Sequence, residues 1–251
     1  MNILSGCTRL RFNSHINHAC YAARHGYGYR FDITPRPLAS VYDHKLHAIL
    51  DCPVDGRWWF WIDDDAFFTR FDTPLADLGV TNGDELLVFP KSPVNLQGGW
   101  TYLSSGNFFF RSTPEVHAFF RAVLATEMPK VQAWWNAGEH GIYTGADQDQ
   151  IVWNLFHDAG IRARTKLVPY EIFNTRPYHF SSATDCFLVH FAVSGMTKAE
   201  AIRQFQQQFG FADDALLPPS AAGDTADYAA FRVPVAAAAE PPSVLRRWFG
   251  R

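Results

Sequence analysis

Three consecutive aspartates, Asp63 to Asp65, directly follow the continuous apolar run Trp58 to Ile62. Adjacent carboxylates repel one another, and a divalent cation relieves that repulsion. Two carboxylates that are two residues apart, on a chain leaving a strand, can both reach one Mg²⁺ or Mn²⁺ and leave positions for phosphate oxygens. An ion held there would neutralise the charge that develops on a departing diphosphate. We therefore predict a metal site at Asp63 and Asp65, with a solvated acidic turn as the alternative.

The elements that must position these aspartates alternate between strand and helix patterns along the chain. The apolar run before them is typical of a strand buried on both faces of a parallel sheet, and ligands bind at the carboxyl ends of such strands. We therefore predict an α/β fold, a single Rossmann-like domain with a mixed, mostly parallel sheet. Strands are expected at residues 2–7, 27–33, 58–62, 85–89, 106–111, 168–173 and 187–191, and helices at 13–25, 40–50, 113–125, 148–159 and 199–209.

Two basic residues near the end of the predicted strands and helices are candidates to act beside the metal. His190 lies in the strand expected at 187–191, and its neutral imidazole would complete the ligands of the cation. A buried core histidine is the alternative. Lys198 precedes a predicted helix, where it would either offset the charge of a leaving group or only be solvated.

Small and polar residues elsewhere are candidates for contacts with a substrate. Ser105, Gly106 and Asn107 would let a ligand approach the chain closely, because glycine has no side chain in the way. A strand bulge is the alternative for this segment. Arg9 and Asp32 follow the first two predicted strands, so topology alone places them near a bound nucleotide.

Much of the chain resembles one known family of glycosyltransferases, the yeast galactosyl/mannosyltransferases and plant xyloglucan xylosyltransferases. Ser105 to Arg111 resembles that family's small-residue strand beneath the donor sugar, and His190-Phe191 resembles its C-terminal metal-binding histidine. The matches span roughly residues 1 to 200. Nearer the N-terminus, the resemblance is carried by Asn17, Tyr21, His25-Gly26-Tyr27, Lys45 and Trp58 to Trp61 running into Asp63-Asp64-Asp65-Ala66.

A second resemblance is to the glycogenin and bacterial lipopolysaccharide galactosyltransferase group. Both groups share the nucleotide-diphospho-sugar transferase (GT-A) fold and retain the anomeric configuration of the donor. The resemblances imply a metal-dependent enzyme that moves a hexose, galactose as first choice, from a UDP-sugar or another nucleotide-sugar to a glycan or other hydroxyl acceptor. This second resemblance rests on Asp147-Gln148-Asp149 followed by Asn154, and on His190, Gly195 and Lys198.

The resemblances also imply roles for the candidate residues. Asp65 and neutral His190 would bind Mn²⁺ or Mg²⁺ directly, and Asp63 would act through a water or on the donor ribose. Asp147 would contact the hydroxyls of the donor sugar and Gln148 would lie near its anomeric carbon, although Asp at a helix start is equally a capping residue. Together the candidate contacts of the donor are Arg9, Asp32, Lys45, Asp63, Ser105, Gly106, Asn107, Gly195 and Lys198.

Two other classes of function remain open from the residues alone. A metal-dependent nucleotidyl or phosphoryl transferase could use the same Asp-rich strand end, but the chain has no Gly-rich loop ending in Lys-Ser or Lys-Thr. A non-catalytic glycan-binding module would need the aromatic residues, which make up 16% of the chain, but not Asp63, Asp65 and His190 together.

Composition restricts the partners and the compartment. A formal net charge of -3 gives no overall basic field, so nucleic acid is not an expected partner. No apolar run approaches the roughly 20 residues that cross a bilayer, and no export signal begins the chain. The four cysteines have no paired spacing, which favours free thiols in a reducing compartment. We therefore expect a cytoplasmic protein.

The composition changes near residue 212 to Ala, Pro, Ser and Asp. Such a segment is typical of a tether, so we predict a catalytic domain at 1–211 and a tether with a tail at 212–251. The tail, Val244 to Arg251, is a small basic amphipathic segment. We expect it to contact an anionic membrane surface or a partner, which would make the protein peripheral to the membrane, and a frayed terminus is the alternative.

Overall fold

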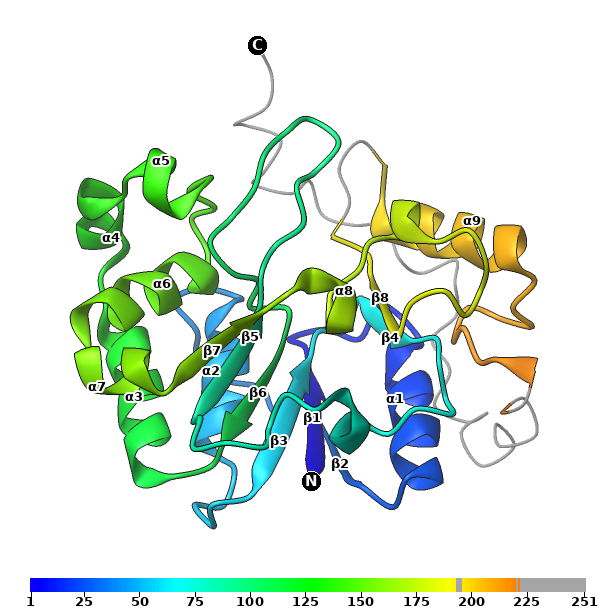
Figure 1. Cartoon of the computed structure of the whole chain (residues 1–251), viewed down its shortest axis with the longest axis horizontal. Coiled ribbons are helices and arrows are strands. Elements are labelled where there is room, and N and C mark those ends of the chain that lie inside the picture. Colours follow the sequence, from blue (N-terminus) through cyan, green and yellow to red (C-terminus); the bar gives the residue numbers. More distant parts are fainter. Residues whose placement is uncertain (193–195, 220, 222–251) are drawn as a thin grey trace.

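The computed structural model describes residues 1–192, 196–219 and 221. Its centre is a six-stranded sheet (Figure 1) formed by β1 (Asn2–Gly6), β2 (Gly28–Asp32), β3 (Trp58–Ile62), β5 (Leu87–Pro90), β6 (Asn107–Arg111) and β7 (Thr165–Val168). The strand order is β2-β1-β3-β6-β5-β7. Neighbouring strands are parallel except at β6, which runs antiparallel to β3 and to β5. The predicted α/β fold with a mixed, mostly parallel sheet is confirmed.

The sheet has an apolar core on each face, because successive residues of a strand point to opposite sides. In β3, Trp59 and Trp61 belong to one core, and Phe60 and Ile62 belong to the other. This explains why the whole strand is apolar. In Figure 1, helices α2 (Asp43–Leu50), α3 (Pro114–Ala125) and α6 (Asp147–His157) cover the first face, and α1 (Ser14–Arg24) covers the second.

A second, two-stranded sheet lies beside the first and consists of β4 (Ala66–Phe68) and β8 (Leu188–His190). The pair is antiparallel, and its register places Ala66 opposite His190. The backbone N–H of Phe191 donates to the carbonyl of Asp65 at 2.9 Å and extends the pairing by one step. Helix α9 (Lys198–Phe209), which begins with a capping box between Thr197 and Glu200, packs on this sheet through a third apolar cluster.

The strand expected at 168–173 is wrong. β7 ends at Val168, and Tyr170–Phe173 forms the short helix α8. Pro169 separates them because proline has no N–H to donate to a neighbouring strand. The sequence patterns also did not indicate β4, the helices α4 (Met128–Trp134), α5 (Ala137–His140) and α7 (Ala159–Ala163), or the 3₁₀ turns η1 (Leu75–Leu78) and η2 (Pro177–His179).

Packing continues beyond residue 211, where the catalytic domain is predicted to end. Ala215, Leu217 and Ala221 are buried in the core that faces α1, and Leu216 is buried in the cluster under α9. The rest of the predicted tether and the basic tail at 244–251 lie outside the described residues. Within the described residues, no helix is both long enough and apolar enough to span a membrane.

Candidate active site

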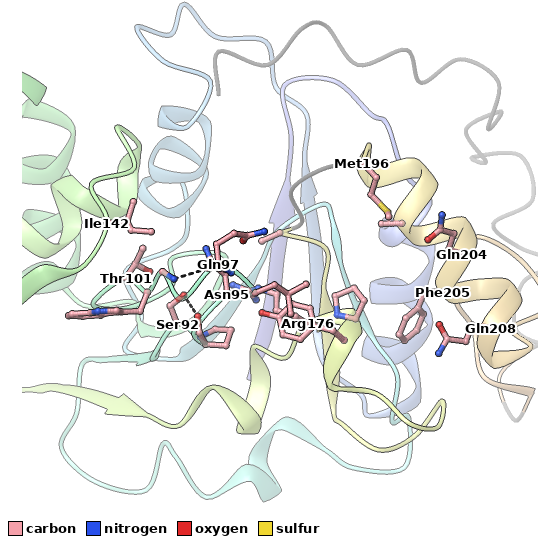
Figure 2. A pocket seen from close by; sticks show the side chains of 18 residues that line it. Ser92, Asn95, Gln97, Thr101, Ile142, Arg176, Met196, Gln204, Phe205 and Gln208 are labelled. Atoms are coloured by element: carbon pink, nitrogen blue, oxygen red, sulfur yellow. Dashed lines mark hydrogen bonds between the residues drawn. The ribbon is translucent and has the colours of Figure 1, made fainter. Parts of the chain in front are cut away.

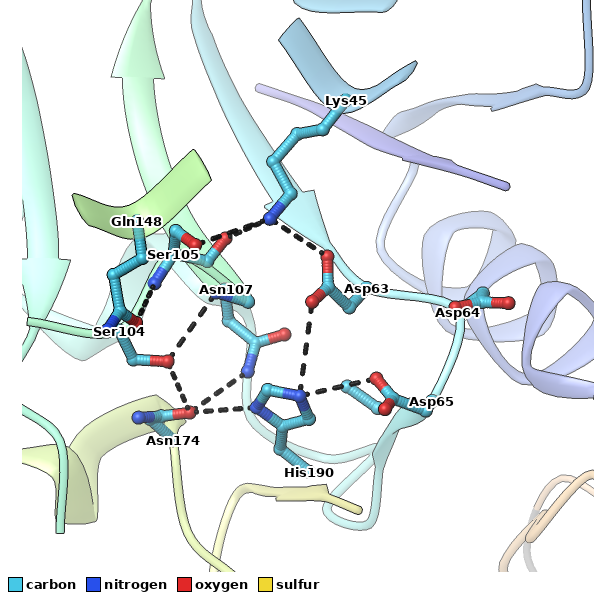
Figure 3. A network of polar contacts seen from close by, with 12 residues as sticks. Lys45, Asp63, Asp64, Asp65, Ser104, Ser105, Asn107, Gln148, Asn174 and His190 are labelled. Atoms are coloured by element: carbon cyan, nitrogen blue, oxygen red, sulfur yellow. Dashed lines mark hydrogen bonds and ion pairs between the residues drawn. The ribbon is translucent and has the colours of Figure 1, made fainter. Parts of the chain in front are cut away.

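Side chains from distant parts of the chain meet beyond the end of β3 (Figure 3). Asp63 and Asp65 follow β3, and His190 is the last residue of β8; one ligand atom from each lies within 4.8 Å of the other two. The Nε2 atom of His190 is 3.2 Å from Asp65 Oδ1 and 4.0 Å from Asp63 Oδ2. Two carboxylates and an imidazole fit a divalent ion, and the nitrogen suits Mn²⁺ better than Mg²⁺, which takes oxygen ligands.

The imidazole of His190 is oriented from behind by Asn174. Its Nδ1 lies 3.1 Å from Asn174 Oδ1 and 3.3 Å from Arg176 Nη1. The tautomer in which Nδ1–H donates to Asn174 would turn the Nε2 lone pair toward the aspartates, as metal binding requires. Arg176 donates to the same Asn174 oxygen at 2.8 Å. Burial lowers the pKa of His190 and outweighs the carboxylate of Asp65, which raises it. The imidazole is therefore neutral at neutral pH, which is the form that binds a metal ion.

Asn174→Ala is expected to weaken Mn²⁺ binding by about 10-fold or more, since residues that orient a ligating histidine typically contribute 10- to 100-fold to metal affinity. The dissociation constant can be measured by Mn²⁺ electron paramagnetic resonance. Asn154→Ala is the matched control, because Asn154 is also a buried asparagine but binds Thr126 and Gln150 instead. Equal Mn²⁺ affinities in the two variants would show that Asn174 does not position His190.

The three aspartates differ in their electrostatic surroundings. Burial opposes the ionisation of Asp65, but Lys198, which donates to it, and His190 together outweigh burial and hold the pKa of Asp65 well below its usual range. Burial raises the pKa of Asp63, and the charge of Asp65 adds to that rise. Burial and repulsion by Asp65 raise the pKa of Asp64 to about 6. Asp65 is thus the carboxylate that is most firmly ionised.

Lys45, from α2, connects the aspartates to the neighbouring loop. Its Nζ donates to the carbonyl of Ser105 at 2.7 Å and to Asp147 Oδ2 at 3.0 Å, and lies 3.3 Å from Asp63 Oδ1. Trp61 donates its indole N–H to the same Asp63 oxygen at 2.7 Å. Burial lowers the pKa of Lys45, but the two carboxylates outweigh burial and raise it. Lys45 is therefore a buried cation between two carboxylates.

The N-terminus of α6 brings Asp147 and Gln148 to the same place. Ala146, not Asp147, occupies the capping position, so the carboxylate of Asp147 is available to Lys45. Gln148 Oε1 accepts from the backbone N–H of Ser105 at 3.3 Å. Asp149 is not one of the three predicted metal ligands, and it accepts two backbone N–H groups of the loop before α6, at 2.7 and 2.6 Å. It fixes the loop that precedes the two candidate catalytic residues.

A glycine is needed at position 106 because two of the predicted metal ligands, His190 and Asp63, pack against it. A Cβ atom at this position would lie 2.9 Å from His190 Nδ1 and 3.1 Å from Asp63 Oδ2. Any larger residue would therefore displace predicted metal ligands. The close approach expected at Gly106 exists, but it is to His190 in the free protein.

A pocket of about 370 Å³ opens over these groups. Asn107 is buried behind it and donates to Asn174 at 3.3 Å, while Arg9 and Asp32 do not line it. Gly195 lies outside the described residues. The predicted residues that do line the pocket are Lys45, Asp63, Asp65, Ser105, Gly106, Asp147, Gln148, His190 and Lys198.

Asp32 is engaged within the protein. Both of its carboxylate oxygens accept from Arg36, at 2.9 and 3.0 Å, and Arg30 donates to one of them at 2.7 Å. Burial opposes its ionisation, but the hydrogen bonds from Arg36 and from the backbone of Thr34 outweigh burial and lower the pKa of Asp32. Its side chain therefore orders the loop after β2, which forms one side of the site.

The sequence patterns missed Trp61, Asn174 and Arg176 as parts of the site. Trp61 was assigned to a strand and to the family resemblance but given no role in the site, although its indole N–H binds Asp63. Asn174 and Arg176 lie in an irregular segment after α8, and both are buried. No spacing or periodicity marks them, so only a three-dimensional arrangement could have shown that they support His190.

Known structures share this architecture, although no protein-family model and no curated protein matches the chain. A glycosyltransferase involved in glycosylation of the major capsid of PBCV-1 superposes with a TM-score of 0.56 at 16% identity, over 77% of this chain and 94% of the other. The galactosyltransferase LgtC, in complex with donor and acceptor sugar analogs, gives a TM-score of 0.47 at 14% identity, over 89% and 99% of the two chains. At 16% identity, the likeness to the PBCV-1 glycosyltransferase shows the fold alone, which is the GT-A fold of nucleotide-sugar transferases.

Proposed function

We propose that this protein is a metal-dependent glycosyltransferase that moves a hexose from a nucleotide-diphosphate sugar to a hydroxyl of a glycan or other acceptor. The observation that carries the proposal is the convergence of Asp63, Asp65 and His190 within 4.8 Å. They converge under a pocket that four cationic side chains also line, among them Lys45 and Lys198. A metal site flanked by cations suits a diphosphate, which carries negative charge both when bound and when it leaves.

Asp65 and His190 would hold the ion directly, with Asp63 acting through a water or on the donor ribose. When bound, Mn²⁺ or Mg²⁺ would supply charge neutralisation to the leaving diphosphate. Lys198, which donates to Asp65, is positioned to add a second positive charge on the same side. We propose a UDP-hexose as the donor, UDP-galactose first and GDP-mannose second.

Asp147 and Gln148 are the proposed catalytic residues. Asp147 would bind hydroxyls of the donor sugar from its place beside Lys45, and Gln148 would lie near the anomeric carbon. The acceptor oxygen forms a bond to the anomeric carbon while the bond from that carbon to the diphosphate oxygen breaks. The departing diphosphate oxygen takes the electron pair of the broken bond. The acceptor proton passes to that diphosphate oxygen on the same face. An amide such as Gln148 is no base, but it can stabilise positive charge at the anomeric carbon.

The expected product therefore keeps the anomeric configuration of the donor. An α-linked nucleotide-sugar should give an α-linked product, since attack and departure occur on one face. NMR of the first-formed linkage measures this directly. A β-linked product would contradict retention and would favour one of the aspartates at the start of α6 as a general base.

The test of the proposed function is donor hydrolysis across a panel of nucleotide-sugars, with Mn²⁺, with Mg²⁺ and with EDTA. We expect one donor to be hydrolysed only with a divalent ion, and to raise the melting temperature because a ligand of the native state stabilises it. Release of pyrophosphate from a nucleoside triphosphate would instead support a nucleotidyl transferase. Sugar binding without any hydrolysis or transfer would support a glycan-binding module.

We also propose that the residues after 221 form the tether and the basic tail, and that the tail contacts an anionic membrane surface or a partner in the cytoplasm. The proposal rests on the Ala and Pro content of the tether and on the alternating apolar and basic residues of the tail. The cysteines within the described residues are free thiols, as is usual in a reducing compartment.

A further inference from the structure

A second pocket, of about 350 Å³, adjoins the candidate active site (Figure 2). One wall is the segment at 92–101, the opposite wall is α9, and the floor is formed by Arg176 and the two residues after it. The two pockets share four lining residues, Ser92, Thr101, Arg176 and Ala192. A molecule bound in the second pocket would therefore extend to the edge of the first.

The second pocket gathers exposed apolar side chains. Ten large apolar residues of the described part of the chain are exposed, and five of them line this pocket. Such a concentration marks a binding surface, since exposed apolar groups are otherwise scattered. The five are Leu96, Trp100, Ile142, Tyr178 and Met196.

The polar groups of the pocket are nearly all uncharged. No carboxylate is among the described residues that line it, and the single charged side chain is Arg176. The Nη1 of that guanidinium already donates to the carbonyl and to the side-chain oxygen of Asn174, at 3.1 and 2.8 Å, and lies 3.3 Å from His190 Nδ1. The remaining polar side chains are the amides of Asn95, Gln97, Gln204 and Gln208 and the hydroxyls of Ser92, Thr101 and Tyr178.

This combination matches a neutral sugar. Amides and hydroxyls both donate and accept, as sugar hydroxyls do. Aromatic rings such as Trp100 and Tyr178 can cover the C–H faces of a pyranose. A phosphorylated or acidic acceptor would instead need several cations, and Arg176, whose Nη1 already binds Asn174, is the single cation among the described lining residues.

The wall at 92–101 is ordered before any ligand arrives. The side chain of Asn95 accepts from the backbone N–H groups of Gln97 and Gly99 at 3.0 and 2.8 Å. The carbonyl of Trp100 accepts from the N–H of Ile142 at 2.8 Å, which ties the wall to the segment after α5. Binding here would cost little ordering of the loop.

We propose that the second pocket is the acceptor subsite and that it takes the uncharged hexose end of a glycan. This inference rests on the proposed glycosyltransferase function. The bound hexose would reach the donor across the shared edge at Ser92 and Thr101, and Gln204 and Gln208 would select neutral hydroxyls from one side. The class of acceptor is thus set by residues that lie outside the metal cluster.

The test uses the full-length protein with Mn²⁺ and the donor found in the hydrolysis panel. Acceptors are p-nitrophenyl glycosides of neutral hexoses, with the matching hexose 6-phosphates and uronic acids. Trp100→Ala should raise the KM of a neutral acceptor by about 10-fold, because a bound hexose would cover this exposed ring and the variant loses that contact. Gln204→Ala should raise it by about 3- to 10-fold. Both should leave donor hydrolysis unchanged.

Gln207→Ala is the matched control for Gln204, because it is an exposed glutamine of the same helix that does not line the pocket. Its acceptor KM should equal that of the unaltered protein. Normal donor hydrolysis with an unchanged acceptor KM in both pocket variants would overturn the subsite. Preference for the phosphorylated or acidic glycosides would overturn the neutral class. Absence of donor hydrolysis in the unaltered protein would instead count against the proposed function itself.

Discussion

Asp65→Asn is expected to lose measurable Mn²⁺ affinity and to lower metal-dependent donor turnover by at least about 100-fold, which is the scale of removing a key electrostatic group. Asp65 Oδ1 lies 3.2 Å from His190 Nε2, so its oxygens face the position that the ion would take. An amide is uncharged and a poor substitute for a carboxylate ligand. Donor hydrolysis and Mn²⁺ titration measure the two losses separately.

The matched control is Asp64→Asn, which removes the same charge from the adjacent residue. Asp64 is outside the metal cluster and lies 3.5 Å from Arg11. It should therefore keep most of the turnover and the Mn²⁺ affinity. If both variants lose activity equally, the effect belongs to the charge of the triplet and not to a ligand at Asp65.

Asp65→Asn should also destabilise the metal-free protein in a pH-dependent way. A carboxyl group whose pKa is lowered by folding contributes stability above its unfolded pKa and loses it as the pH falls through the folded pKa. Because the pKa of Asp65 is held well below its usual range, its contribution is full at neutral pH and declines only in acid. Urea unfolding in EDTA at several pH values measures the difference in unfolding free energy between the variant and the unaltered protein.

The second large effect is expected from Lys45→Met. This change leaves the carboxylates of Asp63 and Asp147 without the cation between them, and breaking such buried pairs costs about 3–5 kcal/mol of unfolding free energy. Since the pKa of Lys45 is raised by folding, its contribution is constant below its usual pKa and is lost only in strong alkali. The loss should therefore be the same from pH 7 to pH 9 in EDTA.

Lys166→Met provides the comparison for Lys45. Lys166 pairs with Glu85 at 3.3 Å, but its side chain is 39% exposed, so its removal should cost less than about 1 kcal/mol. Similar unfolding free energies for the two variants would show that Lys45 does not balance the buried carboxylates. In that case the link between α2 and the metal cluster would be weaker than the contacts indicate.

Local patterns were sufficient for the elements that are long or strongly apolar. The strand expected at 58–62 has the same limits in the structure, because its five apolar residues fill both cores and the aspartates end it. Asp63, Asp65 and His190 were predicted to lie together because each is at the end of an expected strand, and in the structure the three lie together. The strand expected at 168–173 failed where Pro169 divides it.

The residues that hold the predicted metal ligands in place could not be predicted, because they depend on contacts between distant parts of the chain. Asn174 meets His190 only after β8 has paired with β4. The charge distribution is also a property of the folded state. Repulsion within the triplet was expected for all three carboxylates, yet Lys198 donates its hydrogen bond to Asp65, while burial leaves Asp63 and Asp64 with raised pKa values.

The pairing of β4 with β8 sets when the three predicted metal ligands can come together during biosynthesis. Asp63 and Asp65 leave the ribosome early, but His190 comes much later in the chain and reaches them only through the register that places it opposite Ala66. A nascent chain that lacks β8 therefore holds only two of the three ligands. Binding of an ion by all three predicted ligands would therefore have to follow the pairing of β8 with β4. An ion bound at that moment stabilises the completed fold over every partly made one.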